Sequence, residues 1–287
     1  MKTVVLFGAG QVGAMVSRLL GPGYAVSCFV DNDSEKWGSS LAGIPVLSPK
    51  EGLACDPDCF CLCALDEERS GQMGAQIREM GFGGEILRPQ SLNVFDARAA
   101  TMRLLAEQIH EENIPGDVAE LGVYKGDFAI LINAAFPKRI IHLFDTFDGF
   151  DARDVAIEAK ERLSGAKEGD FGGTARDIVD KRLLYREQAR YYKGYFPDTF
   201  TLCRNRTFAF ASIDADLYAP TAAALPLFWD RLSPGGVLMI HDVNSTQFRG
   251  PGRAVKAFCR ERNLLPVPIC DLHGSVLLRK DLQDGKS

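Results

Sequence analysis

Residues 117–126 read DVAELGVYKG, an apolar stretch that runs through Glu120 into a turn with glycines at positions 122 and 126. The stretch is typical of a buried strand, and a helical pattern follows the turn. Gly122 at the end of such a strand lets the backbone come close to a ligand, and N–H groups in the turn can meet an anionic group. Glu120 stands two residues before the first glycine and distinguishes this turn from the dinucleotide-binding G-x-G-x-x-G pattern. The segment therefore predicts a ligand-binding turn between a strand and a helix of an α/β domain.

Further strands are expected downstream, and polar residues stand at their ends. The apolar runs that predict these strands are residues 139–144, 191–196, 208–213 and 237–240. Residues 219–232 are expected to form a helix, with Pro220 in its first turn, where a missing N–H is harmless. The candidate polar residues at the strand ends are Asp145, Asp214, Asp216, His241 and Asp242. Because an open α/β sheet binds ligands at the carboxyl ends of its strands, these side chains are expected to form one site.

Five motifs in this part of the chain together resemble a known family. They are, in order, ELGVYKG, HLFDTFDGF, YYKGYFPDTF, SIDADLYAPT and LSPGGVLMIHD, within residues 117–280. They are similar to those of the macrocin O-methyltransferase family, which methylates sugar hydroxyls on glycosylated antibiotics. The resemblance implies a class I fold, S-adenosylmethionine as the methyl donor and a divalent cation, usually magnesium. The cofactor contacts that it implies are Glu120, Gly122, Val123, Tyr124, Gly126, Asp145 and Thr146.

The same resemblance implies that Asp214 and Asp242 are metal ligands and that Asp216 is the general base. A sugar hydroxyl has a pKa far above 7, so a cation that stabilises the alkoxide and a carboxylate that takes the proton suit the reaction. One departure is His241, which stands where the family usually has the first of two adjacent aspartates. Magnesium prefers oxygen, so the cation could be held by Asp214, Asp242 and water, or be manganese with His241 as a ligand. His241 could instead be the base, Asn244 is a further oxygen donor, and paired acids at a strand end could simply cap the next helix.

Residues 1–95 carry a separate alternation of strand and helix signals. An apolar run at residues 2–7 leads into Gly8-Ala9-Gly10-Gln11-Val12-Gly13, and a second strand at residues 24–30 ends before Asp31. This is the G-x-G-x-x-G pattern in its strand–turn–helix context, where the glycines permit a tight turn, approach to a phosphate and close helix packing. The predicted nucleotide contacts are Gly8, Gly10, Gln11, Gly13 and Asp31.

The strings DND, KWG and GIPVL, which follow at residues 31–47, make this part more specific. Over residues 3–90 the chain resembles the N-terminal nucleotide-sugar-binding domain of bacterial sugar O-acyltransferases, which implies a nucleotide-sugar in the glycine-rich turn. A degenerate domain kept for assembly and an NAD(P)-binding domain are the alternatives. Glycines and a proline at residues 81–93 mark a boundary. We therefore expect two Rossmann-like doubly wound α/β domains, residues 1–95 and 96–287, the second with the class I methyltransferase fold.

Composition narrows the possible partners. A net charge of −5 argues against a nucleic-acid backbone or an anionic membrane surface as partner, and no apolar run approaches the ~20 residues of a membrane span. The N-terminus is expected to be a first strand rather than a signal peptide, so the protein is expected to be cytoplasmic. The expected partner is a small-molecule sugar or nucleotide-sugar, and a homo-oligomer is one assembly that the sequence leaves open. Cys59, Cys61 and Cys63 alternate in a way that predicts a core strand rather than a zinc site.

The sequence thus favours a metal-assisted O-methyltransferase that acts on a sugar or nucleotide-sugar. An NAD(P)-dependent oxidoreductase that uses the first domain, and a non-catalytic scaffold, are the alternatives. His110 and His142 are expected to be structural, while His273 could line the substrate mouth or lie in a surface turn. Residues 151–190 could form a lid over the cofactor or a solvated excursion.

Overall fold

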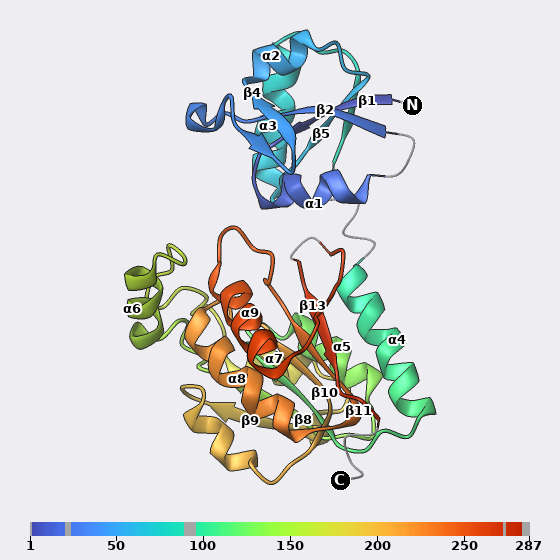
Figure 1. Ribbon diagram of the computed structural model, residues 1–287, viewed down its shortest axis with the longest axis vertical. Helices are drawn as coiled ribbons and strands as arrows, with labels where there is room; N and C mark the ends of the chain where they lie inside the picture. The colour runs from blue at the N-terminus through green and yellow to red at the C-terminus, as the bar shows by residue number, and fades with distance from the viewer. Residues whose placement is uncertain (1, 21–23, 89–95, 272–273, 283–287) are drawn as a thin grey trace. The chain divides into compact units, whose positions relative to one another are not determined.

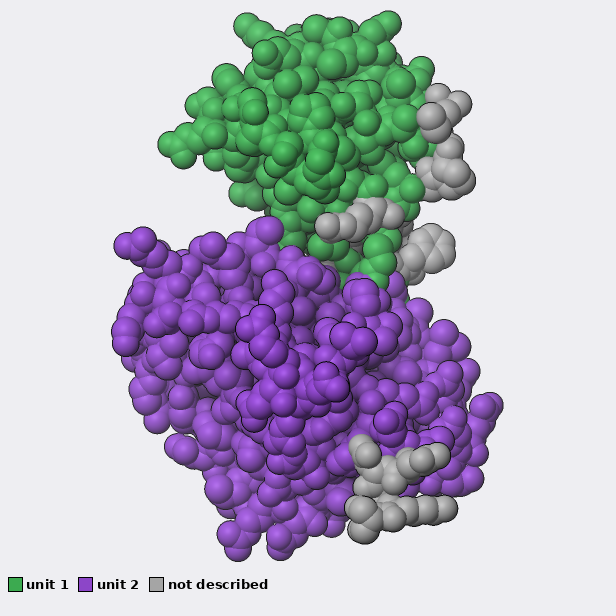
Figure 2. All heavy atoms as spheres, in the orientation of Figure 1, with its two compact units in different colours: residues 1–96, 270–273 green, residues 97–269, 274–287 purple. Residues whose placement is uncertain are grey.

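The computed structural model describes residues 2–20, 24–88, 96–271 and 274–282. The chain divides into two compact units, which Figure 2 shows in different colours. Unit 1 comprises Met1–Asp96 and Cys270–His273, and unit 2 comprises Ala97–Ile269 and Gly274–Ser287. Each unit contains its own sheet and its own core, so each is described by itself.

Unit 1 is a sheet with the strand order β3-β4-β2-β1-β5-β6, in which only the short β3–β4 pair is antiparallel. Its strands are β1 (Lys2–Phe7), β2 (Tyr24–Val30), β3 (Ser40–Leu41), β4 (Ile44–Leu47), β5 (Cys59–Leu62) and β6 (Glu85–Leu87). Its helices are α1 (Gln11–Leu19), α2 (Pro49–Ala54) and α3 (Glu67–Glu79), and Figure 1 shows them around the sheet.

The cysteines of β5 belong to the core of unit 1. Cys59, Cys61 and Cys63 pack with apolar residues of β1 on one face, while Phe60 and Leu62 pack into a second apolar cluster on the other. Every cysteine of the chain is a free thiol. The predicted core strand, buried on both faces, is therefore confirmed.

Unit 2 is a sheet with the strand order β12-β13-β11-β10-β7-β8-β9. Its strands are β7 (Asp117–Leu121), β8 (Ile141–Asp145), β9 (Ala189–Lys193), β10 (Phe208–Ile213), β11 (Leu232–Ile240), β12 (Val267–Pro268) and β13 (Val276–Arg279). β13 runs antiparallel to both neighbours, and the remaining pairs are parallel. The predicted α/β fold class, with two mostly parallel sheets, is confirmed.

Helices cover both faces of the second sheet. They are α4 (Ala97–Glu111), α5 (Asp127–Ala135), α6 (Ala152–Glu161), α7 (Arg176–Arg182), α8 (Tyr218–Arg231) and α9 (Gly250–Arg262). One apolar cluster joins α4, α5 and α7 to the sheet, and another joins α8 and α9 to it; Figure 1 shows α4 on one side of the sheet and α8 and α9 on the other. Within the described ranges, no helix combines the length and the apolar character that crossing a membrane requires.

The strand expected at residues 191–196 is wrong in its bounds. β9 covers Ala189–Lys193, because the chain bends at Gly194, whose φ is +137°. The strand expected at residues 237–240 begins earlier, because β11 starts at Leu232 and its pairing with β10 jumps from Leu232 to Val237. The other predicted strands of unit 2 agree with the structure within two residues at each end.

Candidate active site

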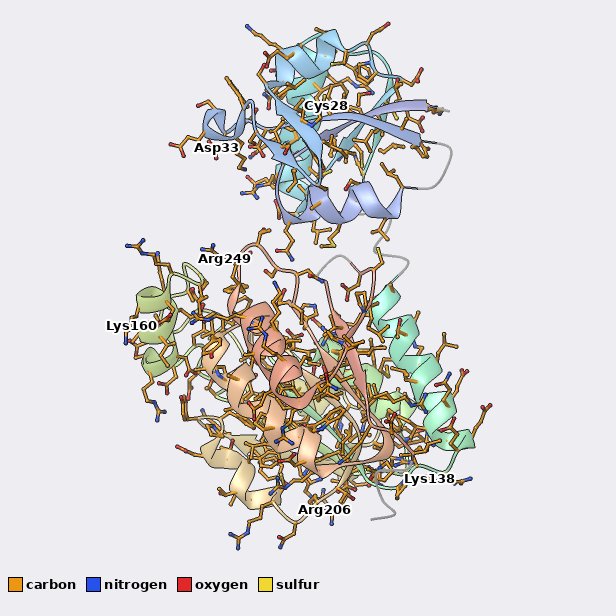
Figure 3. The ribbon with its side chains drawn as sticks, viewed as in Figure 1. Cys28, Asp33, Lys138, Lys160, Arg206 and Arg249 are labelled. Atoms are coloured by element: carbon orange, nitrogen blue, oxygen red, sulfur yellow. The ribbon has the colours of Figure 1, made fainter. Side chains whose placement is uncertain are left out.

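The carboxyl ends of the central strands of unit 2 carry most of the predicted site residues. Figure 3 shows Arg206, which precedes β10, and Arg249, which follows β11, at opposite ends of this unit. The candidate site lies toward the end marked by Arg249, because β7, β8, β10 and β11 all run toward it.

The turn after β7 is packed directly against the segment after β10. Gly122 has φ +83°, and a Cβ at this position would lie 1.8 Å from the carbonyl oxygen of Asp214. The Asp214 N–H also donates to the Leu121 carbonyl at 2.8 Å. A side chain at residue 122 would push these two segments apart, so glycine is required by packing as well as by φ.

Asp145, at the end of β8, braces this turn. Its Oδ2 accepts hydrogen bonds from the N–H groups of Val123 at 2.7 Å and Tyr124 at 2.8 Å, and its Oδ1 accepts from the N–H of Phe147 at 2.6 Å. The hydroxyl of the next residue, Thr146, donates to the carbonyl of Gly149 at 2.7 Å. Sequence reasoning predicted a cofactor contact for Asp145 but missed this bracing role.

Glu120 is 1% exposed, and its Oε2 has no hydrogen-bond partner among the described residues. Burial raises the pKa of Glu120 well above its usual range; the charge of Arg98 opposes this, and Asp214 and Asp145 add to it. An oxygen buried without a donor is costly, so each such atom calls for an explanation. A ligand that brings a donor to the turn would satisfy Glu120.

Asp214, His241 and Asp242 form a tight cluster after two neighbouring strands. His241 Nδ1 lies 2.9 Å from Asp214 Oδ1 and 3.0 Å from Asp242 Oδ2. One ligand atom from each residue lies within 4.8 Å of the others, so the group could hold a metal ion. The sequence predicted that these three residues lie together. Ile213 at the end of β10 pairs with Ile240 at the end of β11, so the residues that follow the two strands are neighbours.

The charged groups of this cluster strongly shift one another's pKa values. Burial would raise the pKa of Asp214, but the positive charges of His241 and Arg98 outweigh it and hold that pKa well below its usual range. Burial would likewise lower the pKa of His241, but the negative charge of Asp214 and hydrogen bonds to both carboxylates raise it to about 10. The imidazole is therefore protonated near neutral pH in this arrangement and bridges the two aspartates.

Arg98 is a member of the cluster that sequence reasoning missed. Its Nη1 lies 2.8 Å from Asp214 Oδ2, and its Nη2 donates to Ser212 Oγ at 3.0 Å. Arg98 is 8% exposed and shares the buried side of α4 with Met102, Ala106 and Ile109. The available signal was the position of Arg98 four residues before Met102, on the apolar side of α4, because a charge there must find a buried partner.

Asp216 lies beside the same cluster. Burial raises its pKa well above the usual range, and the nearby charges of Asp214 and Asp242 raise it further. Both Asp216 and Asp242 have φ +56°, a conformation that non-glycine residues rarely adopt. Such backbone strain concentrates at functional sites, which marks these two positions as candidates beyond their charge.

A cleft of about 490 Å³ opens beside the ends of β8 and β9. Thr146 and Tyr195 are among its lining residues, and Arg153 stacks over the Tyr195 ring at 3.5 Å. Next to it, the ring of Phe150 contacts those of Phe171 and Phe248, at 5.2 and 6.1 Å between centroids. This part of unit 2 therefore offers both a polar cleft and an aromatic surface.

In unit 1, Asp31 braces the glycine-rich turn much as Asp145 does in unit 2. Asp31 accepts hydrogen bonds from the N–H groups of Ala9 at 2.8 Å and Asp33 at 3.0 Å, and pairs with Lys36 at 3.0 Å. Burial would raise its pKa, but these hydrogen bonds lower it. The Cβ of a residue at Gly13 would lie 2.1 Å from the Gly8 carbonyl, whereas a Cβ at Gly10 would have no atom within 4 Å. The turn is therefore tightly packed around Gly13 and leaves open space at Gly10. Gln11 is the first residue of α1.

The remaining polar candidates lie apart from the cluster. His110 Nε2 contacts the Ala135 carbonyl at 3.0 Å, and His142 lies between Asp117 and Tyr192, so both have structural contacts as expected. Asn244 is exposed, and its amide donates to the Gly274 carbonyl at 3.5 Å. His273 lies outside the described residues.

Comparison with known proteins gives a family match and two sets of relatives. A family model described as Macrocin-O-methyltransferase (TylF) matches residues 84–279. An 8-demethyl-8-(2,3-dimethoxy-alpha-L-rhamnosyl)-tetracenomycin-C 4'-O-methyltransferase of Streptomyces olivaceus is 28% identical over 160 residues, 50% of this chain and 59% of that one. The demethyldecarbamoylnovobiocin O-methyltransferase of Streptomyces niveus is 26% identical over 155 residues, again 50% and 59%. The chain thus spans 59% of the length of each of these relatives.

Solved structures agree on the fold of the second part. The O-methyltransferase NovP aligns with a TM-score of 0.52 at 24% identity, covering 64% of this chain and 80% of that one. The calicheamicin methyltransferase CalS11 aligns with a TM-score of 0.53 at 21% identity, covering 63% and 78%. These likenesses concern the fold, and they confirm the predicted class I methyltransferase fold of unit 2.

Proposed function

The chain belongs to the macrocin O-methyltransferase family, and from this we propose that unit 2 transfers a methyl group from S-adenosylmethionine to a hydroxyl of a sugar. The observation that best supports this proposal is that three adjacent strands, β7, β10 and β11, end at a group of acidic residues: Glu120, Asp214, Asp216 and Asp242. The relative from Streptomyces olivaceus is named for O-methylation of a rhamnosyl-tetracenomycin, which supports a glycoside as the substrate, with a nucleotide-linked sugar as the alternative.

The turn after β7 suits the amino-acid portion of the methyl donor. Among the described residues the Oε2 of Glu120 has no partner, so the ionised carboxylate can accept from the donor's ammonium group, and Gly122 leaves the turn without a side chain there. In this proposal Val123, Tyr124 and Gly126 complete the turn that holds the cofactor. Asp145 and Thr146 lie beside it and would face the ribose. S-adenosylmethionine supplies an electrophilic methyl group on a sulfonium.

The cluster of Asp214, His241 and Asp242 fits a divalent cation by its donor set and by its ligand separations within 4.8 Å. Two carboxylates and one imidazole suit Mn²⁺, and the carboxylates with water suit Mg²⁺. When bound, such a cation supplies positive charge that orients neighbouring hydroxyls and stabilises a developing alkoxide. His241 must lose the proton that it shares between the two aspartates before its Nδ1 can act as a ligand.

We assign the proton acceptor to Asp216, with His241 as the alternative. As the sugar oxygen forms its bond to the methyl carbon, the carbon–sulfur bond breaks, and the hydroxyl proton passes to the carboxylate of Asp216. The products are the methyl ether and S-adenosylhomocysteine. Asp216 suits this task because it lies beside the cluster, where burial and the charges of Asp214 and Asp242 raise its pKa and so favour uptake of a proton by its ionised carboxylate.

For unit 1 we propose a nucleotide or nucleotide-sugar site at the glycine-rich turn, in a domain of residues 1–95 that precedes a methyltransferase domain of residues 96–287. The open side of Gly10 and the bracing of the turn by Asp31 support this assignment. An oxidoreductase role has less support, because no histidine precedes His110 in the sequence.

The test is transfer of a labelled methyl group from S-adenosylmethionine to sugar glycosides and nucleotide-sugars. The native protein should methylate at least one of them, and Asp214→Asn should lose most of the activity while it still binds S-adenosylhomocysteine. Asp230→Asn, an exposed aspartate that pairs with Arg262, is the matched control and should keep full activity. Failure of the native protein to bind S-adenosylhomocysteine would contradict the proposed function.

A further inference from the structure

Arg98 is held on three sides in a single position. Its guanidinium carbon lies 3.8 Å from the centre of the Phe128 ring, Nη2 bonds to Ser212 and Nη1 bonds to Asp214. Ser212 is fully buried, and Phe128 lies in the first turn of α5. An arginine fixed by stacking and two hydrogen bonds keeps its geometry far better than an exposed one.

In this position Arg98 contacts one particular oxygen of Asp214. Arg98 takes Oδ2, and the second oxygen, Oδ1, faces His241. A cation bound between Asp214 and Asp242 therefore meets Oδ1 without displacing Arg98, but it meets Oδ2 only if Arg98 moves. Bidentate coordination by Asp214 is blocked as long as the guanidinium stays in place.

We propose that Arg98 determines which divalent cation the site accepts, by restricting Asp214 to one coordinating oxygen. This inference rests on the cation site of the proposed function and goes beyond it. Mg²⁺ takes six ligands at short distances and commonly binds carboxylates through one oxygen, whereas Ca²⁺ takes six to eight and often binds them through two. Arg98 thus disfavours Ca²⁺ over Mg²⁺ and Mn²⁺, and its positive charge weakens the binding of every cation.

The experiment measures the affinities of the full chain for Mg²⁺, Mn²⁺ and Ca²⁺ by calorimetry, without substrate. Arg98→Met removes the charge and keeps most of the apolar stem over Phe128. It should bind all three cations about tenfold more tightly or better, and the gain should be greatest for Ca²⁺. Arg103→Met, on the exposed side of the same helix, is the matched control and should leave all three affinities unchanged.

Two further variants keep the test decisive if Arg98→Met does not fold. Arg98→Lys keeps the charge but loses the planar fork, and Ser212→Ala removes the Nη2 contact, so both should gain Ca²⁺ affinity by a smaller factor. Ca²⁺ affinity that stays at the native value in these variants would overturn the role of Arg98 and leave the cation site intact. If neither the native protein nor any variant binds a cation, the metal site is overturned as well. Binding of S-adenosylhomocysteine is measured separately, and it shows whether the methyltransferase proposal holds without the metal site.

Discussion

Asp145 illustrates how a single carboxylate can prepare a ligand site before the ligand arrives. Its two oxygens accept three backbone N–H groups, all within 2.6–2.8 Å. Hydrogen bonds to a charged acceptor are stronger than those between neutral groups, so this residue fixes the shape of the turn. A contact with ribose would add to this task rather than replace it.

Asp145→Ala should therefore weaken S-adenosylhomocysteine binding by roughly 1–3 kcal/mol and also lower the thermal stability of the protein. Calorimetry and a thermal melt measure the two effects on one sample. Asp148→Ala is the matched control, because Asp148 is 73% exposed, lies three residues further on and pairs with Lys193 at the surface. Unchanged affinity in Asp145→Ala would remove Asp145 from the cofactor site.

Asp154 provides a prediction on pH. Burial raises its pKa from 3.8 to about 6, although a hydrogen bond from the Tyr195 hydroxyl opposes the shift. Because the pKa of Asp154 is higher in the folded state than in the unfolded chain, its neutral carboxyl contributes fully to the stability of the fold below pH 4. This contribution is lost as the pH rises through about 6.

Asp154→Asn should keep the hydrogen bond from Tyr195 without the charge. It should be more stable than the native protein by about 1–3 kcal/mol at pH 7 and equally stable near pH 4. Urea unfolding at both pH values measures this. Asp151→Asn should show the opposite sign at pH 7, because a hydrogen-bonded arginine side chain lowers the pKa of Asp151 to about 2. Equal stability of Asp154→Asn and the native protein at pH 7 would contradict the prediction.

At the scale of single elements, the strands of the central sheet were predictable and the partners of buried charges were not. The runs that became β7 and β10 are apolar and end at glycine or aspartate, so their positions could be read from the local pattern. Arg98 could not be assigned in this way, because its partner Asp214 lies 116 residues away in the chain. The bracing role of Asp145 was missed for the same reason, since it depends on the packing of two turns.

Helix α6 lies within residues 151–190, for which the sequence allowed two interpretations, a lid over the cofactor and a solvent-exposed excursion. Glu158, on α6, is fully buried; its Oε1 accepts from the N–H of Tyr218 at 2.7 Å and its Oε2 from the Ser164 hydroxyl at 2.6 Å. Tyr218 is the first residue of α8, just after Asp216. The helix is therefore tied to the body of unit 2 beside the candidate site.

Glu158→Ala should lower the free energy of unfolding by about 2–4 kcal/mol, because two donors lose a charged acceptor in a buried place. Hydrogen exchange should become faster in α6 and at Tyr218 and remain unchanged in β7. Glu161→Ala, which breaks the exposed pair with Arg253, is the control and should change the free energy of unfolding much less than Glu158→Ala. Exchange that stays slow in α6 of Glu158→Ala would show that other contacts hold this helix.

At the scale of the whole molecule, the family match covers unit 2 and only the last part of unit 1. It begins at residue 84, just before β6, and ends at residue 279 within β13. The strands β1 to β5 and the glycine-rich turn lie outside it. The family match therefore bears on unit 2, and it gives no information on what the glycine-rich turn of unit 1 binds.

The two proposed ligand sites predict two separate binding events. S-adenosylhomocysteine should bind unit 2, and uridine diphosphate or its sugar conjugates should bind at the glycine-rich turn of unit 1. Gly10→Val places a side chain in the open side of this turn, where no atom lies within 4 Å, so the fold should tolerate it.

In Gly10→Val the affinity for the uridine diphosphate ligand should fall about tenfold or more, because backbone approach to a phosphate is blocked, while S-adenosylhomocysteine affinity stays within about twofold. Gly83→Val, also with no atom within 4 Å of its Cβ position, is the matched control and should change neither affinity. Calorimetric titrations of the full chain measure both ligands and NAD in the same way. Micromolar NAD binding that disappears in Gly10→Val would replace the nucleotide-sugar assignment by a nicotinamide site, because the same open turn would then serve a dinucleotide. A native protein that binds neither ligand at this turn would mean that the bracing of the turn by Asp31 preserves the fold of unit 1 without a ligand.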